Sequence, residues 1–115
     1  MSNSNNSLIC LWTVPDAEVA LNMIFMYALN SKRHGWWKDV KLIIWGPSAE
    51  TAAIDPEIQK ELERLLDEGV EVEACKACAE IYGVKDKLEE LGVNVYYIGE
   101  QLTEHLQQDN QVLTF

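Results

Sequence analysis

Basic residues are scarce in this chain. Nine Lys and Arg stand against 19 Asp and Glu, which gives a formal net charge of −10 over 115 residues. Binding to phosphates requires clustered Lys and Arg that release counterions, so this balance argues against a nucleic-acid partner and against an anionic membrane surface. We interpret the charge as serving solubility.

Long apolar runs and targeting signals are lacking as well. No apolar run reaches the roughly 18 residues that a membrane span requires. Ser2 to Ser7 is polar and has no basic residue, so the sequence does not indicate a secretory signal. We therefore expect a cytoplasmic protein without a membrane contact, folded as a single domain over residues 1–115 with residues 1–6 disordered.

Cysteine is also sparse, with Cys10, Cys75 and Cys78 in the whole chain. An odd number of cysteines in a chain that can build a sizeable core is a poor disulfide framework, and we expect reduced thiols. A zinc site needs about four ligands, usually from a second Cys or His pair at short spacing. His34 and His105 each stand alone, so we expect no metal site.

Few prolines and glycines are present, and their positions exclude two common folds. Pro15, Pro47 and Pro56 all precede Cys75, whereas a thioredoxin fold needs a cis-proline downstream of its redox helix. Residues 12–16 contain no glycine, so the first turn cannot bring backbone close to a phosphate as dinucleotide motifs do. We expect no cofactor.

What is present is an alternation of apolar strands and helices. Strands are predicted over 8–12, 40–45, 70–74, 93–98 and 111–115, and helices over 16–33, 55–68, 77–91 with a break at Gly83, and 100–108. The alternation predicts a three-layer α/β/α sandwich around a five-stranded parallel sheet with right-handed crossovers. The ligand crevice of such a sheet lies beyond the carboxyl ends of its strands. The segments expected there are 13–16, 46–50, 75–78 and 99–100.

The first predicted helix, over residues 16–33, is apolar on most of its circumference. Beyond one apolar stripe, most of the remaining circumference is also apolar through Leu21, Phe25, Met26 and Leu29. A helix that is hydrophobic nearly all round is buried nearly all round. A domain of this size has little of its own chain to cover the outer side, so we expect a subunit interface there.

The turn Cys75-Lys76-Ala77-Cys78 follows a buried strand and opens a helix. A thiol at the start of a helix meets unpaired backbone N–H groups and the positive end of the macrodipole, and both favour the thiolate. The spacing of three residues puts both sulfurs on one helical face. Cys75 and Cys78 are therefore the candidate catalytic residues, whereas Cys10 lies within an apolar strand and is interpreted as a packing residue.

The run from Val70 through Cys75 and Cys78 to Gly83, together with the ending Val112-Leu-Thr-Phe115, resembles the DsrE/DsrF-like family of sulfur-relay proteins. The resemblance implies the same three-layer fold and an assembly of trimers or hexamers. It also implies that the cysteine at position 75 carries sulfur as a persulfide between donor and acceptor proteins. Cys78 has no counterpart in the relay subunits, although other members of the family carry a CxxC at this place.

Three functions remain open from the sequence. The leading hypothesis is a persulfide carrier or sulfurtransferase, in which Cys75 holds the sulfur and Cys78 can expel it by forming a disulfide. The second is an oligomeric module that binds a small ligand or a partner protein without catalysis. The third is a dithiol redox protein that cycles a Cys75–Cys78 disulfide. Whether the chain is an enzyme is left open.

Overall fold

The computed structural model describes residues 7–108 and 110–115, and the disorder expected for residues 1–6 lies outside this part. Five strands form one sheet in the order β4-β3-β2-β1-β5, and every neighbouring pair is parallel. The sheet confirms the expected parallel α/β architecture. The strands are β1 (Ser7–Trp12), β2 (Asp39–Ile44), β3 (Glu71–Cys75), β4 (Asn94–Tyr96) and β5 (Gln111–Thr114).

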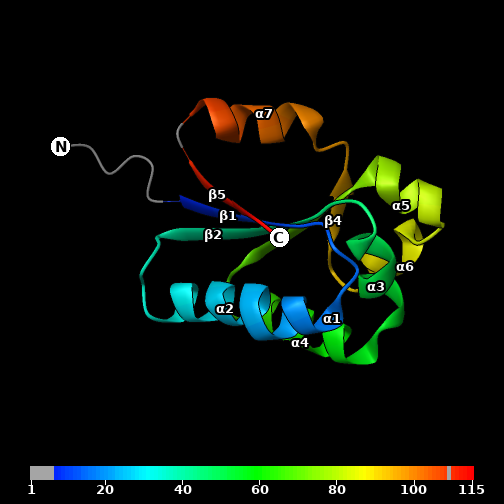
Figure 1. Cartoon of the computed structure of the whole chain (residues 1–115), viewed down its shortest axis with the longest axis horizontal. Helices are drawn as coiled ribbons and strands as arrows, with labels where there is room; N and C mark the ends of the chain where they lie inside the picture. Colours follow the sequence, from blue (N-terminus) through cyan, green and yellow to red (C-terminus); the bar gives the residue numbers. More distant parts are fainter. Residues whose placement is uncertain (1–6, 109) are drawn as a thin grey trace.

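Helices cover both faces of this sheet (Figure 1). Over one face lie the segments α1 (Ala17–Val19), η1 (Ala20–Ile24), α2 (Phe25–Arg33) and α4 (Pro56–Asp67). Over the opposite face lies α7 (Gly99–Gln107). The short helices α3 (Ser48–Ile54), α5 (Lys76–Tyr82) and α6 (Lys85–Glu90) gather at one end of the sheet.

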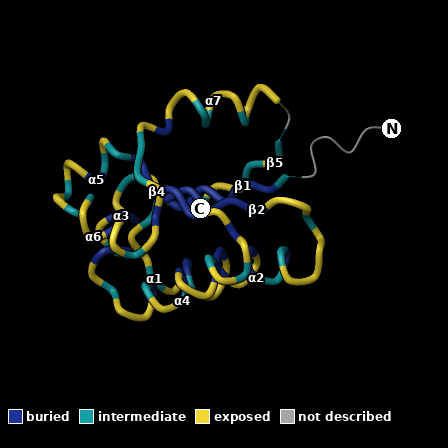
Figure 2. The backbone as a smooth tube through the Cα atoms, turned by 180° about the vertical axis from the view of Figure 1, so that it is seen from behind, coloured by how far each residue is buried: buried dark blue, intermediate teal, exposed yellow. Residues whose placement is uncertain are grey.

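The apolar runs of β1 and β2 follow from burial on both faces of a parallel sheet. Along β1, Leu8, Cys10 and Trp12 enter the larger core beneath α2 and α4, whereas Ile9 and Leu11 face the α7 side. Figure 2 shows the central strands as the most deeply buried part of the chain. The α7 side holds a smaller cluster formed by Ile9, Leu11, Ile43, Cys75 and Ile98.

Local signals set the helix ends as the sequence predicts. The Asp55 carboxylate accepts hydrogen bonds from the amides of Glu57 and Ile58, and Pro56 occupies the first turn of α4. The expected break at Gly83 is confirmed: this residue has φ +69° and ends α5. The amide of Val84 donates to the carbonyl of Ala79, as in a Schellman motif.

Three local features differ from the sequence-based expectation. The helix expected over 16–33 contains a π-helical segment at Ala20–Ile24. Helix α3 covers Ser48–Ile54, where no helix was predicted, because buried Ser48 and a run of small residues pack there. Strand β4 has three residues rather than the expected six, since it pairs at the sheet edge with β3 alone.

Candidate functional site

Cys75 is the last residue of β3 and the residue from which α5 starts. Its backbone is extended, with φ −70° and ψ 120°, so the chain turns directly from strand into helix. The side chain is 6% exposed and packs in the small cluster on the α7 side. Its thiol accepts no hydrogen bond from the amides of α5. The expected contact with the helix N–H groups is therefore not made.

Cys78 lies on α5, one turn after Cys75, and its side chain is partly exposed. Both side chains pack in the same apolar cluster on the α7 side of the sheet. Burial raises the pKa of the Cys78 thiol, and the neighbouring Cys75 raises this pKa further. Cys78 thus holds its proton more tightly than an isolated thiol does.

Gly46 supplies a polar contact to this pair from another strand end. Its backbone N–H donates to the Sγ of Cys78 across 3.2 Å, and this hydrogen bond acts on the pKa of Cys78 in the lowering direction. Gly46 follows β2 and has φ +81°, a left-handed conformation that favours glycine. The amide is held in place because the neighbouring Ser48 hydroxyl donates to the carbonyls of Trp12 and Trp45.

Lys76, the residue after Cys75, directs its positive charge toward Tyr97. The ammonium of Lys76 lies 5.0 Å from the centre of the Tyr97 ring, a cation–π arrangement. The Tyr97 hydroxyl in turn approaches a carboxylate oxygen of Glu80 at 3.5 Å. Both Tyr97 and Ile81 are well exposed near the cysteine turn, so the rim of the site is a mixture of apolar and charged groups.

A second polar feature lies on the same face of the sheet, and the sequence did not predict it. Lys41 of β2 and Glu73 of β3 are buried and form an ion pair with an N···O distance of 3.3 Å. The Tyr96 hydroxyl donates to Glu73, and Gln101 of α7 contacts both Tyr96 and Lys41. Burial raises the pKa of the Tyr96 hydroxyl, and its hydrogen bond to Glu73 adds to this rise.

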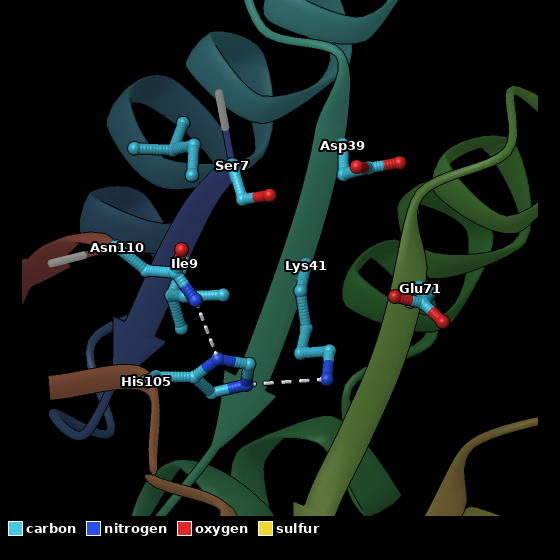
Figure 3. A pocket seen from close by; sticks show the side chains of 8 residues that line it. Ser7, Ile9, Asp39, Lys41, Glu71, His105 and Asn110 are labelled. Atoms are coloured by element: carbon cyan, nitrogen blue, oxygen red, sulfur yellow. Dashed lines mark hydrogen bonds between the residues drawn. The ribbon is translucent and has the colours of Figure 1, made fainter. Parts of the chain in front are cut away.

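His105 joins this network to a pocket of about 160 Å³ at the amino ends of the strands (Figure 3). Its Nε2 lies 3.3 Å from Lys41 Nζ, and its Nδ1 lies 3.0 Å from the side-chain amide of Asn110. Burial lowers the pKa of His105, and the charge of Lys41 lowers it further. The pocket rim carries Asp39 and Glu71, at the opposite end of the strands from the cysteines.

Cys10 is separate from the cysteine turn. It is fully buried in the larger core, and burial raises the pKa of its thiol to about 12. The packing role expected from the sequence agrees with this placement. Among residues 7–108 and 110–115, no group of three or more His, Cys, Asp or Glu gathers in an arrangement suited to a metal ion.

The sequence predicts the cysteine pair but neither the Gly46 contact to Cys78 nor the Lys41–Glu73 ion pair. The Gly46 amide is backbone and carries no residue-type signal beyond the glycine itself. Lys41 does carry one, because a single charge interrupts the otherwise apolar strand 40–44. Glu73 alternates with apolar residues along the strand 70–74, a pattern typical of a half-exposed strand, although its side chain is buried. In the described part of the chain, no helix has the length and apolar character needed to cross a bilayer.

Comparisons with known proteins agree with this architecture. The conserved protein BT1422 of unknown function from Bacteroides thetaiotaomicron is 39% identical, with a TM-score of 0.95, over 100% of this chain and 99% of that one. The ychN protein from E. coli is 21% identical, with a TM-score of 0.71, over 95% of this chain and 97% of that one. The protein of unknown function MTH1491 from Methanobacterium thermoautotrophicum is 15% identical, with a TM-score of 0.74, over the same shares.

The last two likenesses show the fold alone, since their identities are low. Comparison with curated protein sequences found no match. The model of the DsrE/DsrF-like family matches residues 13–115, a segment that includes all of the cysteine turn and all of the sheet after β1. The chain therefore belongs to the DsrE/DsrF-like family.

Proposed function

We propose that this protein is a persulfide carrier in which Cys75 receives a sulfur atom from a donor protein and passes it to an acceptor thiol. The observation that supports this most is the packing of Cys75 and Cys78 in one cluster at the carboxyl end of β3, where ligands of open parallel sheets bind. Family membership is the second support, because the position of Cys75 matches the cysteine that carries sulfur in the relay members.

In this proposal the Cys75 thiolate attacks the terminal sulfur of a donor persulfide. A bond forms between Cys75 Sγ and that sulfur, the donor S–S bond breaks, and the donor leaves as a thiolate. An acceptor thiolate then attacks the outer sulfur and restores the Cys75 thiolate. No external oxidant or reductant is consumed, which distinguishes relay from dithiol redox chemistry. A carrier of this kind works in a reducing compartment, and we propose the cytoplasm.

The test is transfer of labelled sulfur. The protein is loaded with a small persulfide that carries heavy sulfur, freed of donor, and mixed with glutathione. We expect the label to move to glutathione while the protein returns to the mass of its thiol form. A label that stays on the protein would contradict the carrier hypothesis. A protein that instead ends as a Cys75–Cys78 disulfide, which only a dithiol reduces, would favour the dithiol redox hypothesis.

We also propose that copies of this chain assemble through the outer side of the first helical segment. Met23, Met26 and Trp36 are each more than half exposed, and Tyr27 lies among them. These side chains line a shallow hollow of about 250 Å³. A contiguous exposed apolar surface of this kind commonly marks a protein interface. Trimers or hexamers, as the family resemblance implies, are the expected assemblies.

A further inference from the structure

The sulfur of Cys78 accepts a backbone hydrogen bond, and a thiol that acts only by forming a disulfide does not need this contact. The Cys78 sulfur accepts the Gly46 N–H at 3.2 Å, and the same side chain packs against the cluster that contains Cys75. Cys78 therefore lies between a fixed backbone donor and the sulfur that would carry the persulfide. A group placed in this way can give up a proton toward Cys75 while the amide stabilises the negative charge left on its own sulfur.

We propose that Cys78, held by the Gly46 amide, is the general acid and base of sulfur transfer at Cys75. The inference rests on the function proposed above. It gives Cys78 a role other than disulfide formation, and it requires no reductant.

In the loading step, the Cys75 thiolate takes the outer sulfur of the donor persulfide, and the donor departs as a thiolate. Cys78 transfers its thiol proton to that departing thiolate, so the donor leaves as a neutral thiol. The negative charge then resides on Cys78, where the Gly46 N–H meets it. In the release step, Cys78 takes the proton of the acceptor thiol, and the resulting thiolate attacks the outer sulfur on Cys75. The cycle returns Cys78 as a thiol and Cys75 as a thiolate.

Cys78 packs against the apolar cluster that includes Cys75, and the partly buried Tyr96 packs against the same cluster. The nearby polar side chains of Tyr96, Lys76 and Glu80 contact partners other than Cys78. The Tyr96 hydroxyl donates to Glu73. On α5 itself, the charged groups of Lys76 and Glu80 contact Tyr97. The pKa of Cys78 is raised above the ordinary value of a thiol, so Cys78 carries its proton at neutral pH.

The experiment measures the rate at which Cys75 gains sulfur from glutathione persulfide, by quenched-flow and intact mass. Cys78→Ala should slow the gain at least about 100-fold, the lower end of the usual contribution of general acid–base catalysis. Imidazole buffer should restore the rate of Cys78→Ala in proportion to its concentration and leave the wild-type rate unchanged. The wild-type rate should also fall at alkaline pH as Cys78 loses its proton, and Cys78→Ala should lack this decline.

Cys78→Ser is the matched control, because its hydroxyl keeps the size and the acceptor for the Gly46 amide but does not titrate near neutral pH. It should be as slow as Cys78→Ala. A wild-type rate in either variant would overturn the inference, and so would a slow rate that imidazole does not restore. Release of hydrogen sulfide with one Cys75–Cys78 disulfide per turnover would favour the resolving role instead. Absence of any sulfur gain on wild-type Cys75 would reject the proposed function itself.

Discussion

The ammonium group of Lys41 lies 3.3 Å from a carboxylate oxygen of Glu73 on the neighbouring strand, and both side chains are buried. Removing one member of such a pair leaves an uncompensated buried charge, whereas removing both charges does not. Lys41→Met should lower the free energy of unfolding by about 3 kcal/mol. Lys41→Met combined with Glu73→Gln should recover most of this loss, because the glutamine still accepts the Tyr96 hydroxyl.

Urea denaturation of the two variants measures this coupling. A loss below about 1 kcal/mol in Lys41→Met would mean that the pair is screened as a surface ion pair is. A double variant that is less stable than the single one would contradict the account as well.

Protonation of His105 should destabilise the folded chain. The Lys41 ammonium carries only donor N–H groups, so His105 Nε2 must accept from it. The neutral ring then carries its proton on Nδ1, which requires the Asn110 amide to turn its oxygen toward this nitrogen. Because the folded pKa lies below the ordinary value of 6.5, the unfolded state binds the proton more tightly. The contribution of His105 is therefore present above about pH 6.5 and is lost as the pH falls.

Unfolding free energies of the wild type and of His105→Gln, measured from pH 7.5 to pH 5 (roughly the range in which histidine titrates), isolate this contribution. The carboxylates that titrate nearby are common to both proteins, so the difference between the two curves reports His105. The wild type should lose its advantage over His105→Gln on acidification. A difference that stays constant, or that grows toward low pH, would show that the ring is not held neutral.

Replacing Gly83 should destabilise the chain through backbone conformation and not through a steric clash. A Cβ at this position would meet nothing within 4 Å, so the cost of Gly83→Ala comes from φ +69° alone. An L-residue in this conformation costs roughly 1–2 kcal/mol. Gly83→Asn should cost less, since asparagine tolerates the left-handed region better. Equal stability of Gly83→Ala and wild type in urea would contradict the conformation at the end of α5.

Assembly should depend on the outer side of the first helical segment. Met23 and Met26 are 52% and 53% exposed, so Met23→Glu with Met26→Glu should alter the stability of an isolated protomer by less than about 1 kcal/mol. The double variant should nevertheless reduce the mass measured by light scattering. Ile54→Glu, at a more exposed apolar residue on α3, is the control and should leave the assembly intact. A monomeric wild type would reject the interface.

The sequence predicted the parallel sheet and the cysteine turn because both depend on local patterns. Alternation of buried strands with capped helices specifies the layers, and the Cys75–Cys78 spacing alone brings the two sulfurs to one helical side. The Asp55 cap and the Gly83 break were likewise predictable, since each depends on a side chain or a backbone conformation that is specific to one residue type.

The contacts that tune the site depend on tertiary structure and could not be predicted in the same way. Gly46 reaches Cys78 because the ends of β2 and β3 lie side by side, which requires the strand order. Lys41 and Glu73 likewise meet only once the register of β2 and β3 is known. The sequence predicted that N–H groups of α5 would contact the Cys75 thiol, and they do not. The backbone donor that contacts a sulfur is Gly46, after β2, and the sulfur is that of Cys78.

The central claim is that Cys75 carries the sulfur. Its most direct test is the intact mass of four proteins after incubation with the same persulfide donor: wild type, Cys75→Ser, Cys78→Ser and Cys10→Ala. Wild type, Cys78→Ser and Cys10→Ala should each gain the mass of one sulfur atom at long incubation, and Cys75→Ser should gain none. A gain by Cys75→Ser to the same extent as wild type would contradict the account.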